Sequence, residues 1–147
     1  MEVGTGRRLK NGEQIAVLSI GAIGTEAEKA VEAMGKKGVS AAHYDMRFVK
    51  PLDEVMLHEL FSKFKSVVTV EDGCIQGGFG SAVVEWMADQ GYSANVKRLG
   101  VPDRWIEHGT QAELYEECGY DAAAIEEASM EVLAKAGQAG GSASASA

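Results

Sequence analysis

The sequence predicts an α/β fold in which helices cover both faces of one mixed, mostly parallel sheet of five strands. Apolar segments of strand length alternate with segments of helical periodicity from about residue 14 to residue 135. This alternation favours parallel strands joined by right-handed helical crossovers, and so a three-layer sandwich. The length of 147 residues fits a single domain with a sizeable hydrophobic core.

Composition and charge exclude several classes of partner. The formal net charge is -8, from 22 acidic and 14 basic residues, and the sequence has no basic run. Nucleic acid and anionic membrane are therefore not expected as partners. No apolar run approaches the ~20 residues of a membrane span, and the N-terminus lacks a signal-peptide pattern. The only two cysteines, Cys74 and Cys118, lie far apart in the sequence and suggest no disulfide framework. Together these features predict a cytoplasmic protein.

The first elements are predicted from turn and periodicity signals. Asn11-Gly12 is a hairpin signal, so residues 4–9 should form a short antiparallel edge strand beside a central strand at 14–20. Thr25 can cap the helix that follows. Glycines 35 and 38 should end this helix. Its predicted core-facing stripe consists of Ala27, Ala30, Val31 and Met34.

The middle of the chain predicts three more strands and two helices. Strands are expected at 39–45, 66–70 and 95–99. A glycine-rich turn at 77–80 should lead into a helix at 81–90. Asp53 can cap the earlier helix. The predicted apolar face of that helix consists of Val55, Met56, Leu57, Leu60, Phe61 and Phe64.

The last part of the chain predicts a short helix, a final helix and a tail. Thr110-Gln111-Ala112-Glu113 fits a capping box, and Asp121 can cap a helix that runs to about residue 135. Residues 137–147 contain only Gly, Ser, Ala and one Gln, so they cannot bury a large apolar side chain. We therefore expect one domain at 1–136 and a disordered tail or linker at 137–147.

No complete catalytic or metal-binding pattern emerges from the residues alone. The turn at 21–24 follows a strand but has no Lys for a phosphate, so a plain tight turn is the preferred interpretation. Glu71 and Asp72 are adjacent at a strand end, where we expect them to be solvated or ion-paired. The histidines at 43, 58 and 108 have no metal-ligand spacing, and His58 is expected on the polar side of its helix.

Two stretches resemble a known superfamily. Residues 45–53, with the frame D-x-R-x-x-x-P-L-D, resemble a signature of the transketolase C-terminal domain superfamily. The filling Phe48-Val49-Lys50 and the stretch LGVPDRWIEHGTQ at 99–111 resemble its 1-deoxy-D-xylulose-5-phosphate synthases. Residues 15–24 and 68–83 match less closely, and Asp72 stands where that family usually has Glu. The resemblance covers about residues 4–135.

The resemblance implies a structural role within a larger transferase. Such synthases join pyruvate, after decarboxylation, to glyceraldehyde 3-phosphate, for isoprenoid, thiamin and pyridoxal synthesis. Their first two domains bind thiamin diphosphate and Mg²⁺, and the third packs on these domains and helps organise the homodimer. The G-D-G…N metal pattern of the family is not in this sequence, so no catalytic, cofactor or metal residue is expected here, and the isolated chain should be inactive.

The implied partners are the thiamin-binding domains of the same enzyme and a second protomer. Phe79 and Trp105 are expected in an apolar patch that the isolated domain exposes, with core burial as the alternative. A free-standing binding module, or the C-terminal domain of a 2-oxo acid dehydrogenase β subunit, remains an alternative function. The segment at 101–111 favours the synthases over the dehydrogenases. The interface candidates are Arg47, Lys50, Glu71, Gly77, Gly78, Phe79, Gly80, Asp103, Arg104 and Trp105.

Overall fold

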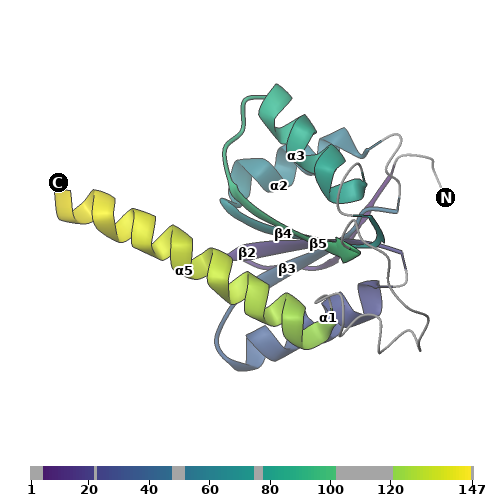
Figure 1. Ribbon diagram of the computed structural model, residues 1–147, viewed down its shortest axis with the longest axis horizontal. Coiled ribbons are helices and arrows are strands. Elements are labelled where there is room, and N and C mark those ends of the chain that lie inside the picture. Colours follow the sequence, from purple (N-terminus) through teal and green to yellow (C-terminus); the bar gives the residue numbers. More distant parts are fainter. Residues whose placement is uncertain (1–4, 22, 48–51, 75–77, 102–120, 147) are drawn as a thin grey trace.

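The computed structural model describes residues 5–21, 23–47, 52–74, 78–101 and 121–146. Within these ranges one five-stranded sheet lies between two helical layers, which confirms the predicted three-layer α/β fold. Helices α2 and α3 cover one face of the sheet, and α1 and α5 cover the other (Figure 1). No helix within these ranges combines the length and apolar character that a membrane crossing requires.

The sheet is mostly parallel, with its single antiparallel strand at one edge. In the order β1-β3-β2-β4-β5, the three pairs among β3, β2, β4 and β5 are parallel, and β1 is antiparallel to β3. The central strand β2 is buried on both faces, as its continuous apolar sequence predicts. The strands are β1 Arg7–Lys10, β2 Ile15–Ile20, β3 Ala41–Asp45, β4 Ser66–Cys74 and β5 Asn95–Val101.

The predicted hairpin between the first two strands is wrong, although the antiparallel edge strand is confirmed. β1 pairs with β3 rather than with β2, because the connection crosses the beginning of β3. The Gln14 amide donates to the Ser40 carbonyl at 2.9 Å, and a Cβ on Gly12 would lie 2.3 Å from the Ala41 carbonyl carbon. Gly12 therefore permits a close crossing of two backbones. The exposed, polar β1 takes the edge, and the apolar β2 takes the centre.

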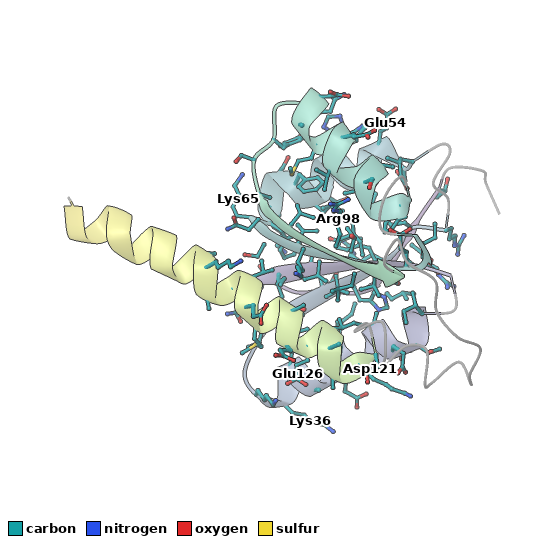
Figure 2. The ribbon with its side chains drawn as sticks, viewed as in Figure 1. Lys36, Glu54, Lys65, Arg98, Asp121 and Glu126 are labelled. Carbon is teal, nitrogen blue, oxygen red and sulfur yellow. The ribbon has the colours of Figure 1, made fainter. Side chains whose placement is uncertain are left out.

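One apolar cluster lies between the sheet and the helices α1 (Gly24–Lys36) and α5 (Ala122–Ser146). The predicted stripe on α1 is confirmed, since all four of its side chains are buried. Thr25 does not cap α1, because the helix begins at Gly24 with Ile23 at its N-cap. Asp121 does cap α5, where its carboxylate accepts from the Ala124 amide at 2.9 Å (Figure 2).

The second apolar cluster lies under α2 (Glu54–Lys63) and α3 (Phe79–Asp89). Asp53 caps α2 as predicted, accepting from the Met56 amide at 3.0 Å. Of the apolar face predicted for this helix, Val55 instead points to solvent with 79% of its surface exposed. The α3 helix begins at Phe79, two residues before the predicted start.

The end of α5 differs from the sequence-based expectation. The helix continues to Ser146, whereas composition predicts a disordered tail from residue 137. In Figure 1 this end projects away from the sheet and its covering helices. Among the α5 side chains that the structure describes, at 122–136, the buried ones lie between Ile125 and Val132. The division of the chain at residue 136 stays a prediction.

Candidate functional site

Of the described candidate residues, Arg47 and Glu71 lie toward the carboxyl ends of two strands, and Gly78, Phe79 and Gly80 begin α3 with Gly78 at its N-cap. Arg47 follows β3, and Glu71 lies in β4 before the beginning of α3. The central strand β2 separates Arg47 from Glu71, whereas Glu71 contacts Phe79 and Gly80 directly. Lys50, Gly77, Asp103, Arg104 and Trp105 lie outside the described residues, as does the predicted capping box at 110–113.

Glu71 is a buried helix cap rather than a solvated carboxylate. Its side chain is 3% exposed, and its two oxygens accept from the amides of Phe79 at 2.7 Å and Gly80 at 3.0 Å. These amides belong to the first turn of α3, which has no intrahelical acceptors for them. The carboxylate also faces the positive end of the helix dipole. The sequence did not predict this cap because Glu71 lies in a strand eight residues before Phe79, whereas an ordinary N-cap residue lies within a few positions of the helix start.

Phe79 belongs to the core, which corrects the expectation that it is exposed. Only 1% of its surface is accessible, and it packs in the cluster under α2 and α3. The cap from Glu71 fixes the first turn of α3 and so directs this ring inward. Gly80 is buried beside it, where an added Cβ would lie 2.6 Å from Thr69 Oγ1 and 3.0 Å from Arg98 Cγ. A side chain at position 80 would therefore separate α3 from the sheet.

Arg47 occupies a backbone conformation that few side chains adopt. Its φ is 60°, in the left-handed region, and its amide donates to Asp45 Oδ1 at 3.2 Å. Asp45 also accepts from Arg7 Nη2 at 3.1 Å, which ties the edge strand β1 to the end of β3. The hydrogen bond to Asp45 holds the backbone of Arg47 at the carboxyl edge of the sheet. Arg47 is half-buried there.

The β5 side of this edge carries a further polar contact. Arg98 Nη1 donates to Ser81 Oγ at 2.8 Å, which links β5 to the first turns of α3 (Figure 2). Neither residue stands out in the sequence, because no motif joins positions 17 residues apart. The polar groups described at this edge thus bind other parts of the same domain.

A buried pair made of one serine and one histidine lies on two neighbouring strands of the sheet. Ser19 on β2 and His43 on β3 are each 1% exposed, and Ser19 Oγ lies 2.7 Å from His43 Nε2. Burial lowers the pKa of His43 below 6.5, and the carboxylates of Asp45 and Glu28 oppose this shift only in part. His43 is therefore neutral near pH 7. Sequence reasoning gave it no role, because its partner lies on a neighbouring strand.

His58 takes part in an aromatic cluster between α2 and α3. It is exposed, as expected, but its Nδ1 lies 2.8 Å from the hydroxyl of Tyr92. Its ring meets Trp86 edge-on, with the ring centroids 4.7 Å apart. The Trp86 indole donates to Glu54 Oε1 at 2.9 Å. These contacts join the two helices. Among the described residues no group of three His, Cys, Asp or Glu side chains is arranged to hold a metal ion.

Comparison with known proteins places this architecture in a family. The family model "Transketolase, C-terminal domain" matches residues 4–125. The chain belongs to the transketolase C-terminal domain family. A solved member, described as "Split gene transketolase, inactive beta4 tetramer", superimposes with a TM-score of 0.85 at 30% identity. That match covers 91% of this chain and 44% of the solved chain.

Several curated members of the family carry the name 1-deoxy-D-xylulose-5-phosphate synthase. The one from Cytophaga hutchinsonii is 56% identical over 123 residues, which are 84% of this chain and 19% of that protein. The one from Bacteroides thetaiotaomicron is 58% identical over 81% of this chain and 18% of its own length. The one from Bacillus cereus is 44% identical over 84% of this chain and 20% of its own length. The chain thus spans about a fifth of the length of the curated relatives it matches.

Proposed function

We propose that the chain is the C-terminal domain of a 1-deoxy-D-xylulose-5-phosphate synthase, where it packs against the catalytic domains and helps organise the dimer. The observation that carries the proposal is the 56% identity to the Cytophaga hutchinsonii synthase over 84% of this chain. Identity at this level favours the synthases over the related 2-oxo acid dehydrogenase β subunits. In the whole enzyme, thiamin diphosphate and Mg²⁺ would support decarboxylation of pyruvate and its addition to glyceraldehyde 3-phosphate, in the cytoplasm.

The described residues fit a packing domain better than a catalytic one. Glu71 is committed to capping α3, and Asp45 is committed to Arg7 and to the Arg47 backbone. A carboxylate held by two amides has little capacity left for acid–base work on a substrate. With no metal-ligand group among the described residues, we assign no step of the reaction to them. The half-buried side chain of Arg47 remains an interface candidate, as do the candidates outside the described residues.

The first test asks whether the isolated chain holds the cofactor. We expect no binding of thiamin diphosphate in the presence of Mg²⁺, and no formation of deoxyxylulose phosphate from pyruvate and glyceraldehyde 3-phosphate. Isothermal titration calorimetry measures the binding directly. A Kd in the micromolar range, about -8 kcal/mol, would falsify the assignment of a purely structural role.

The second test asks whether the chain recognises the remainder of a synthase. The Cytophaga hutchinsonii enzyme without its matching segment would be mixed with this chain and analysed by sedimentation. We expect a complex, because this chain is 56% identical to the removed segment. The isolated domain of a 2-oxo acid dehydrogenase β subunit serves as the control and should not bind. Failure of this chain to bind, with both components folded, would favour a free-standing binding module.

A further inference from the structure

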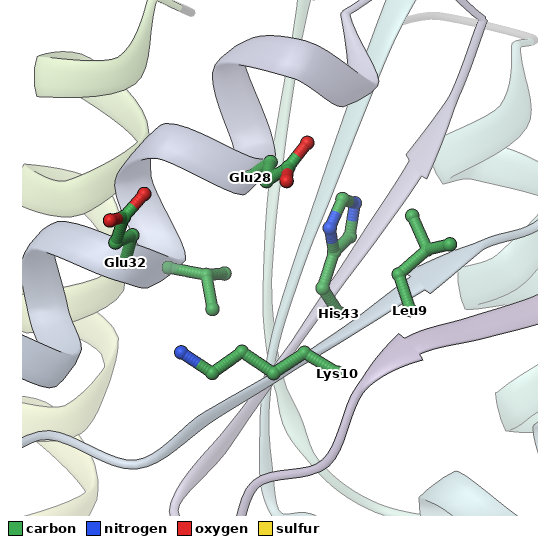
Figure 3. A pocket seen from close by; sticks show the side chains of 6 residues that line it. Leu9, Lys10, Glu28, Glu32 and His43 are labelled. Atoms are coloured by element: carbon green, nitrogen blue, oxygen red, sulfur yellow. The ribbon is translucent and has the colours of Figure 1, made fainter.

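A cavity of about 460 Å³ lies between α1 and the edge of the sheet. Its volume falls within the range of about 300–1,000 Å³ that is typical of small-molecule sites. Its walls come from β1 (Leu9 and Lys10), from α1 (Glu28, Val31 and Glu32) and from β3 (His43). Figure 3 shows the two glutamates on the helix and Lys10 extending from the strand toward the same helix. None of the residues that line this cavity is among those that we assign to domain packing.

A bulge in β1 shapes this cavity. Consecutive strand residues normally point to opposite faces of a sheet. The pairing of β1 with β3 is interrupted between Arg8 and Lys10, and Leu9 and Lys10 both line the cavity. The bulge thus places an apolar and a cationic side chain on the same wall. Leu9 is 46% exposed there, so a bound ligand could bury its apolar surface.

Opposite charges meet at this cavity without pairing. Glu28 and Glu32 are one helical turn apart on α1, and both are exposed. None of the salt bridges among the described residues joins Lys10 to either glutamate. The buried His43 is held by Ser19 and contributes a neutral imidazole. The cavity therefore offers two anionic groups, one cationic group and the exposed apolar surface of Leu9, with the buried Val31 in its wall.

We propose that this cavity binds a small zwitterion that carries an ammonium group, a carboxylate and a short aliphatic side chain, as a free α-amino acid does. The ammonium group would lie between Glu28 and Glu32, and the carboxylate would face Lys10. The aliphatic chain would cover Leu9. Charge-assisted hydrogen bonds at both ends would give such a ligand its orientation. A ligand with only one of the two charges would leave the opposite group of the protein unpaired.

Amide NMR titrations of the full 147-residue chain test the proposal. The probes are L-leucine, 3-methylbutylamine (leucine without its carboxylate) and 4-methylpentanoate (leucine without its amine). We expect L-leucine to shift amides of β1 and α1 with saturation in about the millimolar range, and each analogue to bind at least about tenfold more weakly. Absence of saturable shifts at about 20 mM L-leucine, or equal binding of either analogue, overturns the proposal.

Charge-removing variants identify the binding residues. The double change Glu28→Gln with Glu32→Gln, and separately Lys10→Gln, should each weaken L-leucine binding at least about tenfold. The controls are Glu85→Gln and Lys97→Gln, which remove exposed charges on α3 and β5 and should bind as the parent does. Unchanged binding by the cavity variants overturns the site. If a variant loses its fold, the comparison of the three probes on the unaltered chain still decides.

Discussion

At the level of single residues, the burial of Phe79 predicts a large loss of stability when its ring is removed. Its ring is 1% exposed, so Phe79→Ala should lower the free energy of unfolding by about 3–5 kcal/mol. Val55→Ala is the matched control, because Val55 is 79% exposed and should change stability by less than about 0.5 kcal/mol. Urea denaturation measures both. If Phe79→Ala is as stable as the parent, the ring lies outside the core.

Gly80 tests the close approach of α3 to the sheet. An Ala side chain there would overlap Thr69 Oγ1, which a Cβ would approach to 2.6 Å. Gly80→Ala should therefore cost about 1–3 kcal/mol, and Thr69→Ala in the same chain should recover part of that loss. In the control Gly35→Ala, the new Cβ would meet only Lys10 Nζ at 3.7 Å, so stability should not fall. Additive effects of Gly80→Ala and Thr69→Ala would contradict the contact.

The lowered pKa of the buried His43 should make the stability of the domain depend on pH. Burial lowers its pKa below 6.5, so the unfolded chain takes up a proton more readily than the folded domain. The contribution of His43 to stability is complete above the unfolded pKa of about 6.5 and is lost as the pH falls toward the folded pKa. Replacing His43 with Gln should flatten this part of the curve. Parallel curves for parent and His43→Gln between pH 7 and pH 5, measured by thermal melts, would show that another group is responsible.

At the level of single elements, the predictions that succeeded depend on local signals. The α1 stripe, the Asp53 cap of α2 and the Asp121 cap of α5 each involve residues within a few positions of one another. Two of the predictions that failed depend on distant partners. Nothing near Phe79 in sequence shows that Glu71 caps its helix, and nothing near Gly12 shows that it crosses β3. The Ser19–His43 pair and the shape of the cavity arise from strand order, which short-range patterns do not contain.

The second half of α5 allows a test of the predicted tail. Val132 is the last buried side chain of α5 within residues 122–136, and residues 137–146 include three glycines, each about 1 kcal/mol less favourable than Ala in a helix. We expect amides beyond residue 136 to exchange with solvent at nearly the rate of an unstructured peptide. Amides at 125–132 should be protected. Removal of residues 137–147 should leave the melting temperature unchanged. Protection of the tail amides, or loss of stability on truncation, would show that the helical end is anchored.

At the level of the whole molecule, the sheet joins two independent apolar layers. One layer lies under α1 and α5, and the other lies under α2 and α3. At the carboxyl edge, the side chains of Glu71, Arg98 and Asp45 are occupied by contacts within the domain. In the proposed function, a domain built this way would present a preformed surface to its partner. The fold class and the family resemblance could be predicted from sequence, since both depend on long patterns. The positions of buried groups such as Glu71 and Phe79 could not, because they depend on contacts between distant segments.

The central claim is that this chain works as the third domain of a synthase, and a chimera tests it most directly. The chain would replace the matching segment of the Cytophaga hutchinsonii enzyme, to which it is 56% identical. Formation of deoxyxylulose phosphate from pyruvate and glyceraldehyde 3-phosphate would then be measured. We predict a dimeric chimera with a kcat within about tenfold of the parent enzyme. A chimera that folds and binds thiamin diphosphate but is monomeric and inactive would contradict the account.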